Sequence, residues 1–208
     1  MFPPLYPILD ARFLPVRERS TFLRKLVRDL AGAGIEILQY RNKSGSHAEI
    51  HADACVMREA AGASMRLVLN DWPELALAAG FDGVHVGQTD GSPASAREIL
   101  GQAKIVGIST HNEAQLRAAK SQPVDYIAIG PVFATATKAN PDPVVGLEGV
   151  RAARRITGKT LVAIGGITLE NAADVRQAGA DAVAVISAVF SPDGTPVQAC
   201  RKFLSICR

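Results

Sequence analysis

Three polar side chains, Gln39, Arg41 and Lys43, alternate along one short stretch of the sequence. Side chains two residues apart on a β-strand share a face, so a strand through this stretch would present all three to one side. Arginine can grip phosphate oxygens with two parallel hydrogen bonds, and lysine adds a point charge. One amide and two cations therefore suit a strongly anionic group such as a diphosphate. The alternative is a solvated strand end with two incidental cations.

Two aspartates, Asp71 and Asp90, each follow the end of a short apolar run. Carboxylates at the ends of neighbouring parallel strands can share a hard cation, and Mg²⁺ takes one or two carboxylates together with water and substrate phosphates. The pattern predicts a magnesium site beside the cations. The alternative is local, with Asp71 capping a helix that begins at Pro73 and Asp90 capping a turn.

A glycine pair, Gly165 and Gly166, follows one apolar run, and Ile186 and Ser187 follow the next. Barrel enzymes often bind a monophosphate at the backbone N–H groups of their last two loops, and glycine lets a backbone approach its ligand closely. These residues are therefore a candidate phosphate site. The alternative is that the two glycines only shape a turn.

The elements that would position these residues repeat along the chain. Eight apolar or β-branched runs alternate with helical stretches, and the runs lack polar alternation, as expected of strands covered on both faces. This predicts an α/β fold, a parallel eight-stranded (βα)8 TIM barrel with residues 1–208 as a single catalytic domain. An open flavodoxin-like or Rossmann-like sheet is the alternative, but no GxGxxG motif follows the first run and no GxxxxGK[ST] motif occurs. The expected strands are 6–9, 35–40, 66–69, 83–86, 104–108, 126–129, 161–164 and 182–185, and the expected helices are 21–33, 47–61, 73–79, 93–100, 112–119, 147–157, 169–178 and 196–206.

Several residues predict where helices begin and end. Ser46 and Thr110 are each followed three residues later by glutamate, which is capping-box spacing, and Ser92 precedes a proline suited to a first helical position. Glycines just before expected strands predict left-handed helix ends at Gly34, Gly80 and Gly179.

In a barrel the carboxyl ends of all strands form one rim, where active sites of this fold lie. Polar, charged and glycine residues gather at the expected strand ends, so we expect the site at that rim. The longest irregular stretch, 134–145, also follows a strand, and long loops in compact domains often act as lids.

Composition limits the other classes of function. The net charge of +3 comes from dispersed basic residues, which argues against nucleic acid as a partner. No apolar run approaches the roughly 20 residues of a membrane span, and the first residues show no secretory pattern. The three cysteines form no CxxC or Cys/His cluster, so we expect a cytoplasmic protein without disulfides. Assembly into a homo-oligomer stays open.

The chain resembles the thiamine-phosphate synthase, or thiamine-phosphate pyrophosphorylase, family over essentially its whole length. One departure is Ala134 before Thr135, where many relatives have proline, which affects loop stiffness and leaves the contacting groups in place. The matching segments, in order and at family spacing, are QYRNK (39–43), ND (70–71), GVHVGQTD (83–90), GIST (107–110), GPVFATATK (130–138), AIGGI (163–167) and GADAVAVIS (179–187).

The resemblance implies a transferase of thiamine biosynthesis that uses Mg²⁺. It would join 4-amino-2-methyl-5-pyrimidinylmethyl diphosphate to a thiazole phosphate and release pyrophosphate. Carried over by position, the metal ligands would be Asp71 and Asp90. The pyrimidine diphosphate would bind to Gln39, Arg41, Lys43, Asn70, Ser109 and Lys138, with Arg41, Lys43, Ser109 and Lys138 as the catalytic group. The thiazole phosphate would bind to Thr135, Ala136, Thr137, Gly166, Ile186 and Ser187.

Features of the sequence argue against three alternatives to this reaction. A thiazole tautomerase of the same barrel needs no diphosphate site, yet the complete diphosphate set is present. A sugar-phosphate epimerase would need an acid/base pair or His and Asp metal ligands, which the sequence does not offer. A non-catalytic thiamine-precursor sensor would tolerate loss of the leaving-group cations, and none are lost.

Overall fold

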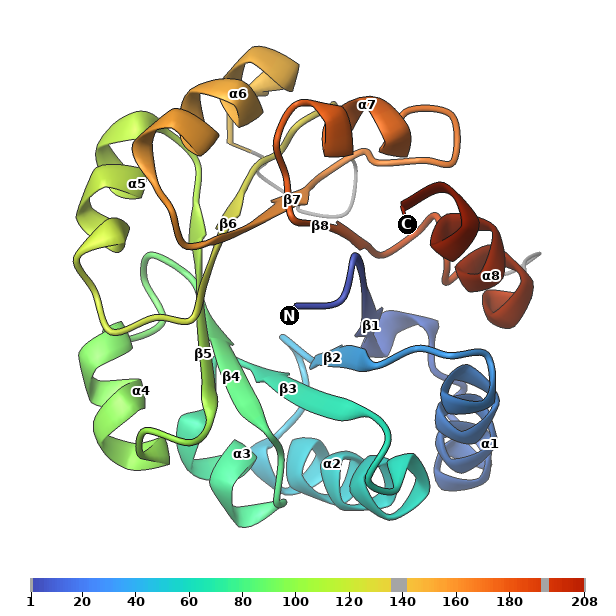
Figure 1. Ribbon diagram of the computed structural model, residues 1–208. Helices are drawn as coiled ribbons and strands as arrows, with labels where there is room; N and C mark the ends of the chain where they lie inside the picture. The colour runs from blue at the N-terminus through green and yellow to red at the C-terminus, as the bar shows by residue number, and fades with distance from the viewer. Residues whose placement is uncertain (1, 136–141, 192–194, 208) are drawn as a thin grey trace.

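The computed structural model describes residues 2–135, 142–191 and 195–207, and in it eight parallel strands close into one barrel in chain order (Figure 1). Pairing of Leu5 with Val183 joins the first strand to the last, which confirms the predicted closed barrel and excludes the open sheet. The strands are β1 (Leu5–Asp10), β2 (Ile37–Arg41), β3 (Arg66–Asn70), β4 (Gly83–Val86), β5 (Ile105–Thr110), β6 (Tyr126–Ile129), β7 (Thr160–Ile164) and β8 (Ala182–Val185).

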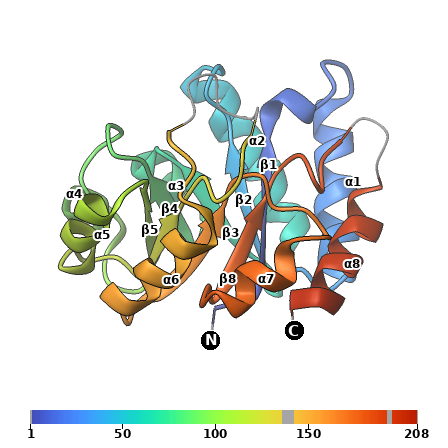
Figure 2. The same ribbon diagram turned by 90° about the horizontal axis from the view of Figure 1, so that it is seen from above.

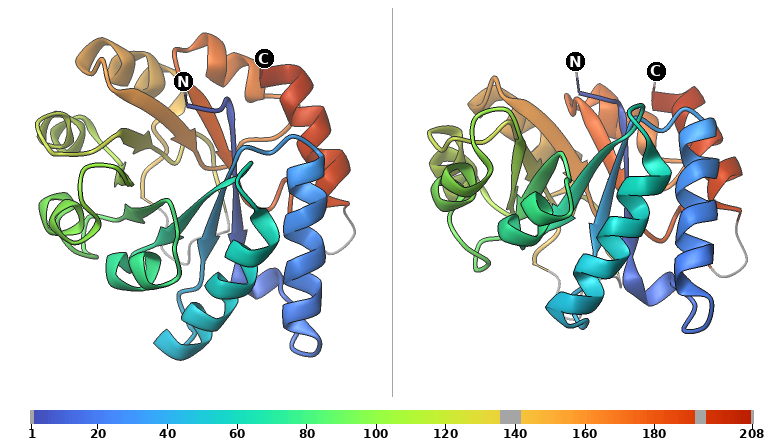
Figure 3. Two further views of the ribbon diagram at one scale, coloured as in Figure 1. Left: turned by 60° about the horizontal axis from the view of Figure 1, so that its bottom comes forward. Right: turned by 90° about the horizontal axis from the view of Figure 1, so that it is seen from below.

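Helices surround the barrel and complete the repeating unit (Figure 1). A short 3-10 helix, Ala11–Phe13, follows β1 and was not predicted. The ring closes where α1 lies beside α8 (Figure 3). The helices are α1 (Arg19–Gly32), α2 (His47–Ala61), α3 (Pro73–Ala78), α4 (Pro93–Leu100), α5 (Glu113–Lys120), α6 (Gly146–Ile156), α7 (Ala172–Gln177) and α8 (Pro196–Cys207).

Apolar side chains form two buried clusters, one on each side of the sheet. The larger cluster lies between strands and helices and includes Leu38 and Tyr40. The smaller cluster fills the barrel interior and includes Tyr6, Ile37 and Tyr126. Because side chains alternate along a strand, Tyr40 faces the helices while its neighbours on β2 face the barrel axis, which is why the strands need apolar residues at nearly every position.

Of the six residues predicted to start or end helices, five are confirmed and one is wrong, although several helix bounds differ by one to three residues from the expected ones. Ser46 makes the predicted capping box, and Ser92 caps α4 by accepting a hydrogen bond from the Ser95 backbone. Thr110 does not cap α5, because β5 runs two residues further than predicted and buries Thr110, whose hydroxyl donates to the Ala128 carbonyl. The cap of α5 is instead made by Asn112. The predicted left-handed glycines have φ of 86° at Gly34, 69° at Gly80 and 110° at Gly179.

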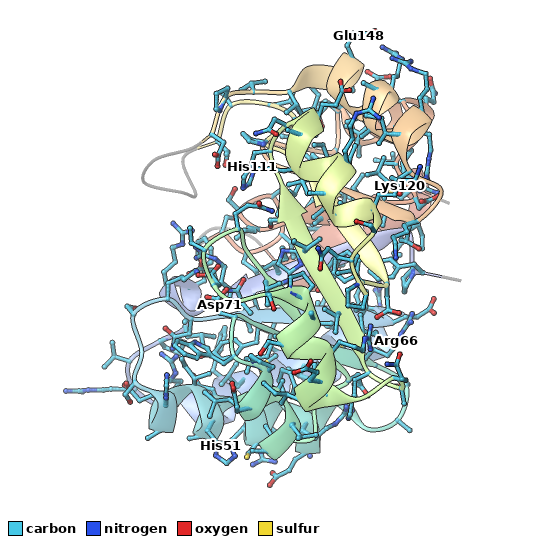
Figure 4. All side chains as sticks on the ribbon, turned by 90° about the vertical axis from the view of Figure 1, so that its left-hand side faces the viewer. His51, Arg66, Asp71, His111, Lys120 and Glu148 are labelled. Atoms are coloured by element: carbon cyan, nitrogen blue, oxygen red, sulfur yellow. The ribbon has the colours of Figure 1, made fainter. Side chains whose placement is uncertain are left out.

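The two ends of the barrel differ in what they carry. Both chain ends lie at one end of the barrel (Figure 2). Asp71 and His111, which follow the carboxyl ends of β3 and β5, lie at the opposite end from Arg66 and Lys120 (Figure 4). None of the helices in the described part of the chain combines the length and apolar character needed to cross a membrane.

Candidate active site

A cavity of about 550 Å³ opens at the carboxyl ends of the strands. Residues from both halves of the barrel line it, as expected when strand ends converge on one rim. Three predicted site residues, Ala136, Thr137 and Lys138, lie outside the described residues, as does much of the 134–145 stretch. The other predicted residues all line the cavity, namely Gln39, Arg41, Lys43, Asn70, Asp71, Asp90, Ser109, Thr135, Gly166, Ile186 and Ser187.

Two carboxylates meet at one ammonium group on the β2–β4 side of this cavity. Lys43 Nζ lies 2.6 Å from Asp71 Oδ2 and 3.3 Å from Asp90 Oδ1. The alternative role of Asp71 as a helix cap is wrong, because α3 is preceded by Trp72 and has no side-chain cap. The turn role of Asp90 holds alongside the ion pair, since its Oδ2 accepts a hydrogen bond from the Gly87 backbone at 3.2 Å.

This aspartate pair fits a divalent cation. Burial raises the pKa of Asp71. The nearby charge of Asp90 adds to this rise, and Lys43 opposes it. A bound cation would therefore stabilise the charged form of this carboxylate pair. Asp71 also has φ of 71°, a left-handed conformation that is uncommon for non-glycine residues. Among the described residues, no group of three or more His, Cys, Asp or Glu is gathered around one point. The pair matches the one or two carboxylates typical of Mg²⁺.

Arg41 is held in place by Asp10, a residue that the sequence did not single out. Asp10 ends β1, is buried, and forms an ion pair with the Arg41 guanidinium. The strand register places Asp10 directly beside Arg41 on the neighbouring strand. An acidic residue at the end of β1 was therefore the one sequence signal that could have identified it. A second arginine, Arg12, contacts the same carboxylate at 3.2 Å. The guanidinium at the cavity wall is therefore oriented by a buried charge.

Buried polar groups line the floor of the cavity. Gln39 and His85 are 2% and 8% exposed, and the His85 ring nitrogen Nε2 lies 2.8 Å from Ser109 Oγ. Burial lowers the pKa of His85 to about 4, which keeps the ring neutral at pH 7. Asn70 Nδ2 is buried and has no hydrogen-bond partner among the described residues. Since buried donors are nearly always paired, this amide is available to a ligand.

The opposite wall is built from the loops after β7 and β8. Gly165 and Gly166 have φ of 102° and 64°, and both pack against the segment that follows β6. An added Cβ on Gly166 would lie 2.6 Å from the Ala134 carbonyl oxygen. Glycine is therefore needed there for both conformation and space, and its backbone lies at the cavity surface beside Ile186 and Ser187.

Comparison of the chain with known proteins identifies its family. The family model described as thiamine monophosphate synthase matches residues 5–189. A thiamine-phosphate synthase from Koribacter versatilis is 49% identical over 98% of this chain and 95% of the relative, and one from Chloroflexus aurantiacus is 39% identical over 94% and 88%. The solved thiamine phosphate pyrophosphorylase from Pyrococcus furiosus superposes with a TM-score of 0.84 at 30% identity, covering 98% of this chain and 94% of that one. The chain belongs to the thiamine monophosphate synthase family.

Proposed function

We propose that this cavity joins 4-amino-2-methyl-5-pyrimidinylmethyl diphosphate to a thiazole phosphate, forming thiamine phosphate and pyrophosphate. The observation that supports the assignment is that one cavity carries both a wall with two cations and a wall with a glycine loop. Arg41 and Lys43 stand on one wall, and the Gly166 loop stands on the other. A thiazole tautomerase would need only the second wall, so the first favours the condensing reaction.

The diphosphate binds on the cationic wall in this proposal. Arg41, held by Asp10, supplies a planar donor pair, and Lys43 supplies a point charge. Asn70 contributes its unpaired amide donor, and Ser109 and Gln39 stand beside it. Lys138 is expected to join this group. Asp71 and Asp90 would hold Mg²⁺, which supplies charge neutralisation of the diphosphate when bound.

The reaction needs no protein nucleophile. The bond between the pyrimidine methylene carbon and the diphosphate oxygen breaks, and its electron pair leaves with pyrophosphate. The resulting cation is delocalised into the aminopyrimidine ring, and the lone pair of the thiazole nitrogen then forms the new carbon–nitrogen bond. Catalysis consists of positioning two substrates and stabilising charge on the leaving group.

The test is incubation of the purified chain with both substrates, with and without Mg²⁺, following thiamine phosphate and pyrophosphate together. We expect both products in equal amounts and only in the presence of the metal ion. Product formed equally well after metal removal would contradict the assigned roles of Asp71 and Asp90, and no product under any condition would contradict the function. Cytoplasmic localisation stays a prediction that cell fractionation can check.

A further inference from the structure

A chain of hydrogen bonds runs through the barrel interior from one cavity residue to another. The Gln39 amide donates to the Tyr6 hydroxyl at 2.9 Å, and the Tyr6 and Tyr126 hydroxyls lie 3.0 Å apart. The Tyr126 hydroxyl lies 2.8 Å from His85 Nδ1, and His85 Nε2 lies 2.8 Å from Ser109 Oγ. Both terminal residues line the cavity, whereas the two tyrosines do not. We name Gln39, Tyr6, Tyr126, His85 and Ser109 the interior relay.

Packing alone does not account for the hydroxyl groups of the interior relay. Tyr6 and Tyr126 are 1% and 0% exposed in an otherwise apolar cluster, where phenylalanine rings would fill nearly the same space. A buried hydroxyl costs free energy unless it is hydrogen-bonded. The neighbouring strand also makes room for the ring, since a Cβ on Gly107 would lie 2.0 Å from Tyr126 Cζ. The barrel interior therefore holds a paired polar connection where apolar rings would also fit.

The connection has a direction. With the Gln39 amide as donor, the Tyr6 hydroxyl proton has the Tyr126 oxygen as its acceptor in this chain, and the Tyr126 proton in turn goes to His85 Nδ1. A neutral imidazole then carries its proton on Nε2 and donates it to Ser109. In this direction the Ser109 hydroxyl proton is not used within the interior relay, and Ser109 lines the cavity where a ligand could accept it.

We propose that Tyr6, Tyr126 and His85 are positioning residues that fix Ser109 as a hydrogen-bond donor to the pyrimidine diphosphate. The inference rests on the proposed function, which supplies the ligand. Phosphate oxygens and pyrimidine ring nitrogens are acceptors, so a serine locked as a donor recognises this substrate better than one that can turn either way. The reversed chain, with the Gln39 amide turned over, would leave Ser109 as an acceptor.

The first test reads the direction without any activity measurement. ¹⁵N-edited NMR distinguishes the two neutral tautomers of histidine, and the His85 signal can be assigned by its loss in His85→Gln. We expect the Nε2–H tautomer at neutral pH in the unsubstituted protein and a mixture of tautomers in Tyr126→Phe. The Nδ1–H tautomer in the unsubstituted protein, or no change in Tyr126→Phe, would overturn the proposal.

The second test measures kinetics. Tyr126→Phe should lower kcat/KM for the pyrimidine diphosphate by about tenfold, the loss of one oriented hydrogen bond, while KM for the thiazole phosphate stays unchanged. Tyr6→Phe should act in the same direction. In a His85→Gln background, whose amide can donate to Ser109 by itself, Tyr126→Phe should have no further effect. An equal effect of Tyr126→Phe in both backgrounds would overturn the proposal.

A matched control removes the same atom elsewhere in the barrel. The Tyr40 hydroxyl is also buried but bonds to Asp53 on the helix side of the sheet, so Tyr40→Phe should lower stability and leave the His85 tautomer unchanged. A shifted tautomer in this variant would count against a specific relay. If the unsubstituted protein formed no thiamine phosphate, the proposed function would fail, while the tautomer measurement would still decide the direction.

Discussion

The Arg41 guanidinium lies at the cavity wall in an ion pair with Asp10, and in the proposed reaction this pair binds the leaving diphosphate. Asp10→Asn removes the charge that orients the guanidinium. Small misplacements of a positioning group can cost up to about 10²-fold in rate, so we expect kcat/KM for the pyrimidine diphosphate to fall by about tenfold or more. The control is Arg12→Ala, which removes the other arginine on Asp10 and should have a much smaller effect. Equal losses in steady-state kinetics would argue against this role.

Asp71 gives a second prediction at the scale of single residues. Its carboxylate shares Lys43 with Asp90, so Asp71→Ala should lower kcat by about 10²-fold or more, as for other losses of charge-stabilising groups. The Mg²⁺ concentration needed for half-maximal activity should rise as well. Glu74→Ala, which removes an exposed carboxylate from the start of α3, is the matched control and should be near normal. A near-normal rate in Asp71→Ala would count heavily against the metal site.

Single residues were predictable where their chemistry was visible in the sequence. Arg41, Lys43, Asp71 and Asp90 stand out because charged groups at strand ends need a partner. Asp10 escaped because its partner lies on the adjacent strand, and only the strand register brings the two together. Tyr6 and Tyr126 begin two of the expected strands, but a buried hydroxyl network leaves no trace in hydrophobic patterning, so their connection was not predicted.

Among the elements, the β7–α7 loop of the site is constrained in both backbone conformation and space. Gly166→Ala would strain a residue with φ of 64° and push its Cβ against the Ala134 carbonyl, so the loop must shift. We expect KM for the thiazole phosphate to rise by about tenfold or more, with a smaller change for the pyrimidine diphosphate. Gly158→Ala is the control, because an added Cβ there meets no atom within 4 Å. Similar kinetics for both variants would remove this loop from the site.

Element order was predictable from alternating strand and helix patterns, and the bounds of β4, β6 and β8 match the expected ones. The errors lie at the ends of strands and helices, where tertiary contacts decide which residue is the last of the element. Thr110 has the spacing of a cap, yet it stays in β5 because its hydroxyl bonds to the next strand. Capping propensity cannot anticipate a hydrogen bond made across 18 residues of sequence.

For the whole molecule, buried ionisable groups limit the stability of the fold at alkaline pH. Burial raises the pKa of the Cys200 thiol to about 12 and raises the pKa of Tyr6, Tyr40 and Tyr126 as well. A raised folded-state pKa contributes stability that is complete below the unfolded-state pKa and is lost as pH rises toward the folded-state value. We expect the free energy of unfolding to fall above about pH 9, by about 1.4 kcal/mol per pH unit for each group in its range.

Spectroscopy can check this alkaline limit directly. These are all 3 tyrosines of the chain, so tyrosinate absorbance should appear only as the helical circular dichroism is lost. Denaturant titrations at neutral and alkaline pH should show the midpoint falling. Tyrosinate absorbance that appears in a protein with unchanged helix content would show that the barrel admits hydroxide without opening.

The space that Gly107 leaves for the Tyr126 ring couples the evolution of these two positions. A residue larger than glycine at position 107 would clash with an aromatic ring at position 126, so the ring must be replaced first. Replacing the ring while Gly107 is kept causes no such clash. Among relatives, a residue larger than glycine at position 107 should therefore occur only where position 126 has lost its aromatic ring, whereas glycine at 107 can accompany either residue.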